Sequence, residues 1–139
     1  IKENKHTSIY KDFAHSPSKL KATIKSVKQQ FPNRKLVSCM ELHTFSSLNK
    51  KFLKEYSNSM DDTDIGIVYF NKKTIQNKKL NVISKKEVID SFKRKDLKVF
   101  NDSNLLKDFL NSLSWKQRNL LMMSSGNFNN LDLNKIISI

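Results

Sequence analysis

Ile65-Gly66-Ile67-Val68-Tyr69-Phe70 is a continuous apolar run, and this stretch decides the fold. It is short and rich in β-branched residues, which is the pattern of a strand covered on both faces. Stretches with weaker strand character lie on either side of it, at residues 8–12, 35–40, 97–100 and 119–123. The sequence therefore predicts about five core strands.

Segments with helical periodicity separate these strands. Pro17 follows Ser16 and precedes apolar residues at helical spacing, so a helix is expected to begin there with Ser16 as its cap. Residues 71–82 are rich in Lys and Asn, show no periodicity and are expected to form a loop. The other predicted helices are residues 48–56 after a Ser46 or Ser47 cap, a helix that starts with a Ser84–Glu87 capping box, and residues 105–113 after an Asp102 or Ser103 cap.

Alternation of strand and helix along residues 1–139 predicts an α/β fold in one domain. The expected architecture is Rossmann-like, a mainly parallel sheet of about five or six strands with helices on both faces. In such sheets ligands bind at the carboxyl ends of the strands. The loops at residues 12–17, 41–47, 71–80 and 124–128 should therefore share one edge, which is the candidate site.

Composition restricts the function further. The formal charge is +13, but only three of the 26 cationic side chains are arginines, Arg34, Arg94 and Arg118, whereas phosphate and base readers favour the guanidinium group. No apolar run is long enough to cross a membrane. The single Cys39 excludes an internal disulfide and is expected to be a buried thiol in a reducing compartment. The chain opens on Ile1, so we expect it to be cut from a longer protein.

The first loop has the chemistry of a phosphate site. Asp12 can accept from ribose hydroxyls, His15 can reach a phosphate or its metal, and Ser16-Pro17 begins a helix whose free amides favour an anion. The same residues also suit a plain helix start with a surface histidine.

Two further loops supply polar groups to the same edge, and the loop at residues 124–128 has the hydroxyls, amides and aromatic ring to bind a carboxylate or a peptide. Capping or turn formation would explain several of these residues equally well. No Walker-type loop, zinc-spaced Cys/His set or nucleophile elbow is present, so no metal site and no catalysis by this piece alone are expected. The candidates are His43, Thr44 and Ser46 in one loop and Ser124, Ser125, Asn127 and Phe128 in the other.

Four segments carry a resemblance to a known family. Residues 12–17, Asp-Phe-Ala-His-Ser-Pro, resemble the Asp-Tyr-Ala-His-Thr/Asn-Pro motif that opens the carboxy-terminal domain of Mur ligases and folylpolyglutamate synthetases. Residues 18–23, 31–36 and 41–46 look like the ligases that act on UDP-N-acetylmuramate. Within the family, the chain is similar to the ligase that adds L-alanine and to the ligase that recycles the L-alanyl-γ-D-glutamyl-diaminopimelate tripeptide.

The resemblance implies a cytoplasmic, ATP-dependent ligase of peptidoglycan synthesis or recycling. Its central domain, outside this chain, would hold most of the ATP and Mg²⁺, and this domain would close over the nucleotide and present the acceptor amine. By resemblance Asp12 would meet the ATP ribose and His15 would lie near the phosphates, beside Ser16 and Pro17. His43 and residues 124–128 would border the acceptor amino acid or peptide. The partners implied are UDP-N-acetylmuramate, the acceptor and the other domains of the same chain, with no nucleic acid and no membrane.

Departures from the family pattern leave alternatives open. Thr44-Phe45-Ser46-Ser47 stands where the L-alanine ligases carry arginines, and the Asp-Asn-Pro-Arg motif that reads diaminopimelate is absent, so tripeptide recycling is an alternative to alanine addition. A basic Rossmann-like nucleic-acid-binding module is the alternative from another class. A response-regulator-like domain is disfavoured because the strand ending at Phe70 is followed by Asn71 and not by a phosphoacceptor Asp.

Overall fold

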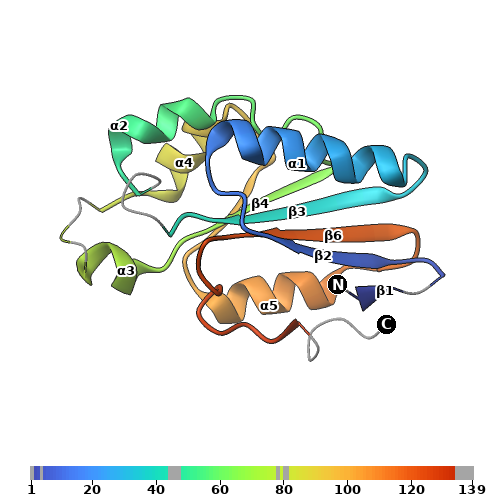
Figure 1. Ribbon diagram of the computed structural model, residues 1–139. Helices are drawn as coiled ribbons and strands as arrows, with labels where there is room; N and C mark the ends of the chain where they lie inside the picture. The colour runs from blue at the N-terminus through green and yellow to red at the C-terminus, as the bar shows by residue number, and fades with distance from the viewer. Residues whose placement is uncertain (1, 4, 44–47, 78, 80–81, 134–139) are drawn as a thin grey trace.

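A six-stranded sheet forms the centre of the molecule in the computed structural model, which describes residues 2–3, 5–43, 48–77, 79 and 82–133 (Figure 1). The strand order is β1-β2-β6-β3-β4-β5. The strands are β1 (Lys2–Glu3), β2 (Ser8–Asp12), β3 (Lys35–Glu41), β4 (Ile65–Tyr69), β5 (Lys98–Phe100) and β6 (Arg118–Met123).

The pairs β2–β6, β6–β3, β3–β4 and β4–β5 are all parallel, which confirms the predicted α/β fold with a mainly parallel sheet. Only β1 is antiparallel, where Lys2 lies opposite Ile9. This edge strand was not predicted, because two polar residues carry no alternating pattern. It follows from the pairing offered by β2 and not from a preference of its own.

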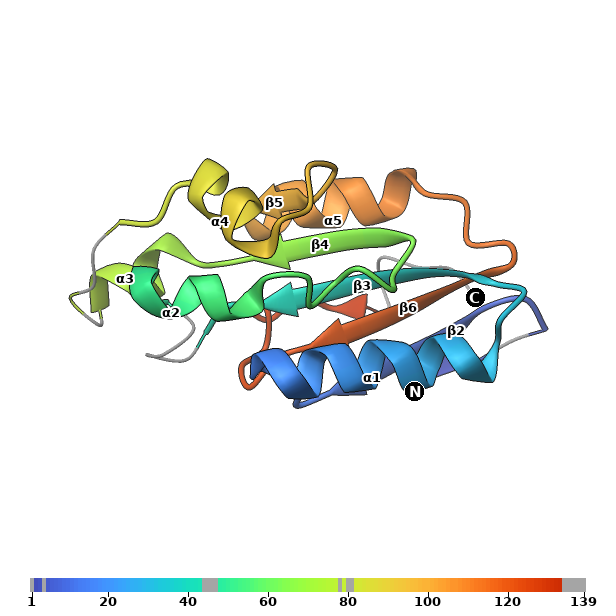
Figure 2. The same ribbon diagram turned by 90° about the horizontal axis from the view of Figure 1, so that it is seen from above.

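Helices cover both faces of the sheet, as predicted. The α1, α2 and α4 helices lie on one face and α5 on the other, as Figure 1 and the view from above in Figure 2 show. The helical elements are α1 (Pro17–Gln30), α2 (Lys50–Leu53), the 3-10 helix η1 (Lys54–Tyr56), α3 (Lys72–Asn77), α4 (Lys85–Phe92) and α5 (Ser103–Ser112).

The two faces of the sheet have separate apolar clusters, which follow from the two-residue period of a strand. In β3, Leu36 and Met40 pack with α1 and α4, whereas Val37 and Cys39 pack with α5. The buried position of Cys39 is as predicted, and burial, with a contribution from Glu41, raises the pKa of its thiol. Each fully buried aliphatic side chain contributes roughly 1.5–3 kcal/mol of transfer free energy.

The helix starts agree with the sequence signals in part. Both bonds of the Ser84–Glu87 capping box are present, and the Asp102 side chain accepts from the backbone N of Asn104. Asn49 caps α2 by accepting from Lys51, whereas the predicted caps, Ser46 and Ser47, lie outside the described residues. The single predicted helix over residues 48–56 is instead a short α2 followed by η1.

The prediction of a loop over residues 71–82 was wrong at its start, because α3 occupies Lys72–Asn77. The Asn71 side chain accepts from the backbone N of Lys73 at 2.9 Å and so begins this helix. Only Ile75 of the helix is buried, which is why no apolar periodicity announced it. Across the part of the chain that the structure describes, no helix is both long and apolar enough to cross a membrane.

Candidate functional site

The strands β2, β6, β3 and β4 end at one edge of the sheet, so the loops that follow them meet there (Figure 2). The backbone N of Ser124, just after β6, donates to the carbonyl of Asp12 at 3.0 Å. The hydroxyl of Ser124 in turn donates to Glu41 Oε1, at the end of β3, at 2.6 Å. The predicted nucleotide loop and the predicted acceptor loops are therefore directly joined.

The loop after β2 is folded by the side chain of Asp12. Its Oδ1 accepts from the backbone N of Ala14 at 2.7 Å, which makes a tight turn of the chain. Ala14 is buried, while the Asp12 side chain stays at the surface. One carboxylate oxygen shapes the loop, and the other is available for a ligand hydroxyl.

His15 is held by its backbone and by its ring. Its Nδ1 lies 2.8 Å from the carbonyl oxygen of Phe13, so this nitrogen carries the proton and donates. The carbonyl of His15 accepts from the hydroxyl of Tyr56, a buried side chain of η1. This arrangement leaves Nε2 as the ring atom that can bind a ligand.

The start of α1 keeps its amides uncapped by a side chain. Ser16 lies at the predicted cap position in extended conformation, and its carbonyl accepts from the N of Leu20 at 2.9 Å, but its hydroxyl makes no cap bond. Ser16 therefore is the cap residue by position, as predicted, but its side chain does not contribute to the cap. Pro17 follows at the first helical position, as predicted, and has no amide to satisfy. The N–H groups of the remaining first-turn amides can donate hydrogen bonds to an anion.

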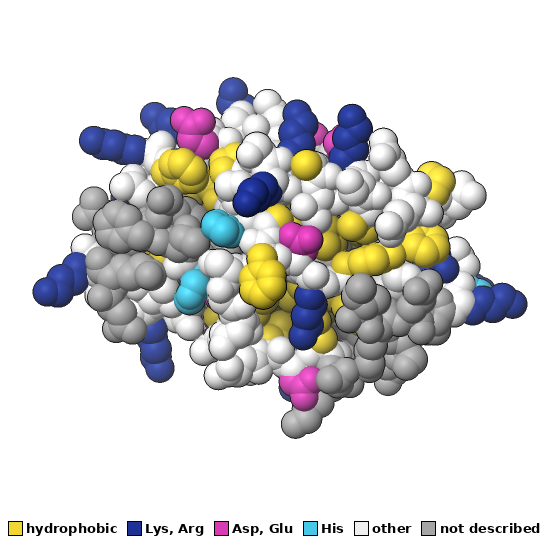
Figure 3. Space-filling model, viewed as in Figure 1, with side chains coloured by type: hydrophobic (Ala, Val, Ile, Leu, Met, Phe, Trp, Pro, Cys, Tyr) yellow, Lys and Arg dark blue, Asp and Glu magenta, His cyan; other side chains and the backbone are white. Residues whose placement is uncertain are grey.

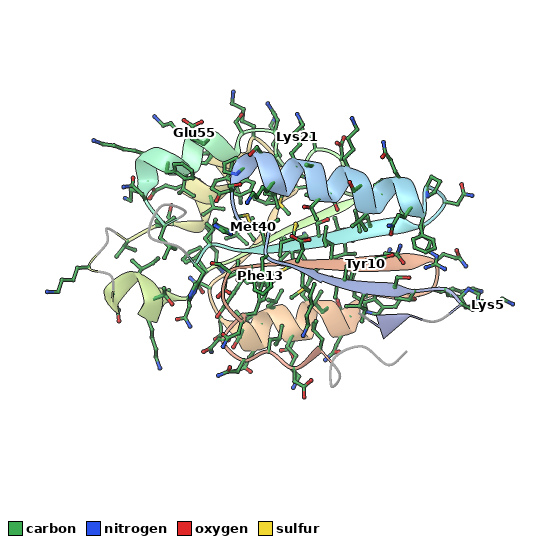
Figure 4. The ribbon with its side chains drawn as sticks, viewed as in Figure 1. Lys5, Tyr10, Phe13, Lys21, Met40 and Glu55 are labelled. Carbon is green, nitrogen blue, oxygen red and sulfur yellow. The ribbon has the colours of Figure 1, made fainter. Side chains whose placement is uncertain are left out.

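Phe13 is the most exposed large apolar side chain among the described residues, at 81%. Figure 4 shows it where the chain leaves β2, next to the residues described above. On the same face in Figure 3, both His and apolar side chains lie near the centre, while most Lys and Arg side chains are spread around the rim. On this face the positive charge is thus dispersed and does not form a continuous basic track.

A pocket of about 490 Å³ opens between the end of β2 and the segment after β6. Predicted residues of both groups line it, Asp12 from the nucleotide group and Ser124, Asn127 and Phe128 from the acceptor group. Lys11 places a cation at the same pocket. A volume of this size is within the range of pockets that bind small molecules.

The acceptor-side residues are organised around Glu41. His43 is partly exposed, with Nδ1 3.9 Å from Glu41 Oε2. The backbone N of Phe128 donates to Glu41 Oε1 at 3.0 Å, and the Phe128 ring stacks on Tyr69 with centroids 6.0 Å apart. Burial, followed by nearby carboxylates, raises the pKa of Tyr69 to about 12. Ser125 and Asn127 are exposed on this loop.

Some features of the site could not be placed or were missed. Thr44 and Ser46 lie outside the described residues. Glu41 and Tyr56 organise the loops, yet the sequence suggested only a loop carboxylate and a core aromatic. Their signal was a charged residue directly after the apolar run 36–40 and a tyrosine on a buried stripe. Within the described ranges, no three His, Cys, Asp or Glu side chains are placed to hold a metal ion.

Curated relatives are ligases of UDP-N-acetylmuramate. The chain is 41% identical over 58 residues to the UDP-N-acetylmuramate–L-alanine ligase of Lactobacillus delbrueckii subsp. bulgaricus, a match that covers 42% of this chain. It is 39% identical over 57 residues to the enzyme of the same name from Lactobacillus helveticus, covering 41% of this chain. The chain spans about 13% of the length of these relatives. No protein-family profile matches it.

Solved structures of ligases share the fold. A domain of a Haemophilus ducreyi protein assigned as a UDP-N-acetylmuramate:L-alanyl-γ-D-glutamyl-diaminopimelate ligase aligns with a TM-score of 0.62, 19% identity and coverage of 90% of this chain and 85% of that one. A murein peptide ligase from Psychrobacter arcticus aligns over 100% of this chain and 30% of its own, with a TM-score of 0.67 and 17% identity. The MurF ligase of Thermotoga maritima, in complex with ADP, aligns over 91% of this chain and 27% of its own, with a TM-score of 0.54 and 19% identity. The predicted resemblance to a Mur ligase carboxy-terminal domain is confirmed.

Proposed function

We propose that this chain, which is similar to Mur ligases in sequence and to their carboxy-terminal domains in fold, is part of an ATP-dependent ligase that joins UDP-N-acetylmuramate to an amino acid or peptide. It would act in peptidoglycan synthesis or recycling, in the cytoplasm. The observation that carries the proposal is the direct contact between Ser124 and Asp12, which brings the nucleotide loop against the acceptor loop. A ligase that activates a carboxylate with ATP must bind the nucleotide and the acceptor side by side.

The loop of residues 12–17 suits the nucleotide. The second carboxylate oxygen of Asp12 can accept from a ribose hydroxyl, and the uncapped amides after Pro17 can donate to phosphate oxygens. His15 Nε2 is the remaining polar contact that this loop offers to a phosphate. When bound, ATP would supply the phosphoryl group that activates the muramoyl carboxylate. Mg²⁺ and most contacts to ATP would come from a further domain of the same protein.

The opposite side of the edge suits the acceptor. His43, Ser124 and Phe128 lie against the Glu41 carboxylate, Ser125 and Asn127 are exposed on the same loop, and Thr44 and Ser46 follow His43 in the chain. This domain would hold the acceptor so that its neutral amine approaches the activated carboxyl carbon. The new C–N bond forms as the C–O bond to phosphate breaks, and the amine loses a proton.

The activity is tested by measuring phosphate release from ATP by the full-length enzyme. UDP-N-acetylmuramate is supplied in every reaction, and L-alanine or the L-alanyl-γ-D-glutamyl-diaminopimelate tripeptide is offered as acceptor. Release with one acceptor and not the other supports the proposal and identifies the substrate. The 139-residue chain alone is expected to be inactive, because under this proposal the groups that activate the carboxylate would lie in another domain.

Absence of release with either acceptor, on folded full-length protein, would overturn the proposal. The +13 charge would then make nucleic acid the next ligand to titrate, with a steep loss of affinity in salt as the diagnostic result.

A further inference from the structure

Glu41 is a buried carboxylate on the α5 side of the sheet. It follows Val37 and Cys39 in the two-residue period of β3, and it is only 2% exposed. Burial of an ionised carboxylate is costly unless donors surround it. Among the described residues the only basic side chain within 4.0 Å is His43, whose Nδ1 lies 3.9 Å from Oε2, so the carboxylate is met mainly by hydrogen bonds.

Within the described part of the chain, two hydrogen bonds reach Glu41, and both come from the loop after β6. The hydroxyl of Ser124 donates to Oε1 at 2.6 Å, and the backbone N of Phe128 donates to the same oxygen at 3.0 Å. The Ser124 hydroxyl also accepts from the N of Gly126 at 2.7 Å. Hydrogen bonds to an ionised acceptor are roughly twice as strong as those between neutral groups. Glu41 thus binds the loop at its first residue, Ser124, and near its end, at Phe128.

The backbone conformation of this loop has to be stabilised by interactions with the rest of the molecule. Phe128, Asn129 and Asn130 are three consecutive residues in the left-handed region, with φ of 53°, 56° and 61°. For most residues with a side chain, such as Phe128, this conformation costs roughly 1–2 kcal/mol, and asparagine tolerates it more readily. Interactions outside the turn must therefore hold it. Among the described residues these include the Glu41 carboxylate, the stacking of Phe128 on Tyr69, and a 3.4 Å hydrogen bond from Asn129 Nδ2 to Ser103 Oγ.

The loop also lies tightly over Glu41 and His43. A Cβ added at Gly126 would lie 2.9 Å from Glu41 Oε1 and 2.9 Å from the His43 ring. The position of the loop, the Glu41 carboxylate and the imidazole are consequently interdependent. A substitution at Glu41 should therefore alter the positions of both the loop and the His43 ring.

We propose that Glu41 is a positioning residue which holds the loop 124–130 in its left-handed shape and thereby sets the affinity for the acceptor. The inference rests on the function proposed above, because it assigns the loop to acceptor binding. Glu41 does not touch the reacting atoms. It acts through Ser124 and Phe128, the two residues it binds.

The loop itself is tested by amide hydrogen exchange on the 139-residue chain. Glu41→Ala should accelerate exchange at Phe128 by about tenfold or more, since loss of a charge-assisted bond of this strength corresponds to at least that factor. Glu41→Gln, whose neutral carbonyl can still accept from Phe128, should accelerate exchange clearly less than Glu41→Ala. Glu55→Ala, which removes an exposed carboxylate of η1 (Figure 4), is the matched control and should change nothing. Unchanged Phe128 exchange in folded Glu41→Ala would overturn the proposal.

A second variant keeps the test decisive if Glu41→Ala does not fold. Ser124→Ala retains the buried carboxylate and its bond from Phe128 but removes the acceptor for Gly126. We expect faster exchange at Gly126, while the amides of the β-sheet remain protected. If Gly126 is protected as strongly as in wild type, Glu41 and Ser124 do not hold this loop in place.

The consequence for binding is tested in the full-length enzyme by steady-state kinetics. Glu41→Ala should raise the KM for the acceptor about tenfold while the KM for ATP changes less than about twofold, and Glu41→Gln should restore most of the loss. Equal increases in both KM values, or no rescue by glutamine, would contradict the positioning role. If the wild-type enzyme releases no phosphate, the proposed function fails, while the exchange measurement still decides whether Glu41 holds the loop.

Discussion

The hydroxyl of Tyr56 donates a hydrogen bond to the backbone carbonyl of His15, which ties η1 to the loop that leads into α1. Tyr56 is fully buried, stacked on Phe92 with centroids 5.1 Å apart and edge-on to Phe52. Burial also raises the pKa of its hydroxyl, so the group remains a donor throughout the physiological range. A core side chain therefore fixes the position of a loop proposed to bind nucleotide.

Tyr56→Phe should destabilise the chain by about 0.5–1.5 kcal/mol, because the His15 carbonyl loses its donor while the packing is kept. The change is measured by urea unfolding, together with the NMR shift of the His15 ring. Tyr10→Phe removes a hydroxyl that binds Gln30 at the surface, at 3.0 Å, and is the matched control. An equal or larger loss of stability for Tyr10→Phe would contradict the anchoring role of Tyr56.

Asp64 makes the stability depend on pH. Burial alone would raise its pKa, but the Lys28 ammonium at 2.7 Å and the backbone N of Leu36 at 2.7 Å, with a smaller effect of Lys35, hold it below the ordinary value. A lowered folded-state pKa contributes stability above the unfolded-state pKa, and this is lost as the pH falls through the folded-state value.

The stability difference between wild type and Asp64→Asn should accordingly be largest near neutral pH and should shrink as the pH drops below about 4. Unfolding free energies measured between pH 7 and pH 2 give this difference directly. A difference that stays constant over the range would mean that the Asp64 charge contributes nothing.

Asn129 offers a test of the left-handed turn, since its φ is 56°. Asn129→Gly should be neutral or stabilising, because glycine adopts this conformation without a steric penalty. Asn129→Val should destabilise by about 1 kcal/mol or more, because a β-branched side chain is disfavoured there. Thermal unfolding of the two variants is the measurement, and valine as stable as glycine would exclude the turn.

Substitution of Phe13 is expected to affect activity but not stability. Its ring is 81% exposed, so Phe13→Ala should change the unfolding free energy of the isolated chain by less than about 0.5 kcal/mol. In the full-length enzyme the same change should lower kcat/KM for ATP, since the ring lies beside Asp12 on the face proposed to meet the nucleotide and the remaining domains. Unaltered kinetics would remove Phe13 from that face.

The fold could be predicted because local signals and the tertiary structure agree. The apolar run at residues 65–70 is indeed a central strand, and the Ser84–Glu87 capping box starts α4 as expected. The α3 helix escaped prediction because only Ile75 of it is buried. Its signal was a single cap residue, Asn71, in a stretch that otherwise resembles a loop.

The site could be predicted less completely, for a physical reason. Sequence order and the rule for parallel sheets indicated which loops converge, and Asp12 and Ser124 are in fact hydrogen-bonded through their backbones. The hydrogen bond from Phe128 to Glu41 joins residues 87 positions apart, and no local sequence pattern encodes such a pair. The shape of the acceptor loop is therefore a tertiary property.

The most direct test is the KM for ATP of the full-length enzyme, measured by phosphate release for Asp12→Ala and for Asp61→Ala. Asp61 is an exposed aspartate in the loop that precedes β4, near the opposite edge of the sheet, and serves as the matched control. Asp12→Ala should raise the KM for ATP about tenfold or more, as expected for loss of a hydrogen bond to an ionised group, whereas Asp61→Ala should leave it unchanged. If the two variants behave alike, or if release does not depend on UDP-N-acetylmuramate, the account of this domain as the nucleotide-closing part of a Mur ligase is wrong.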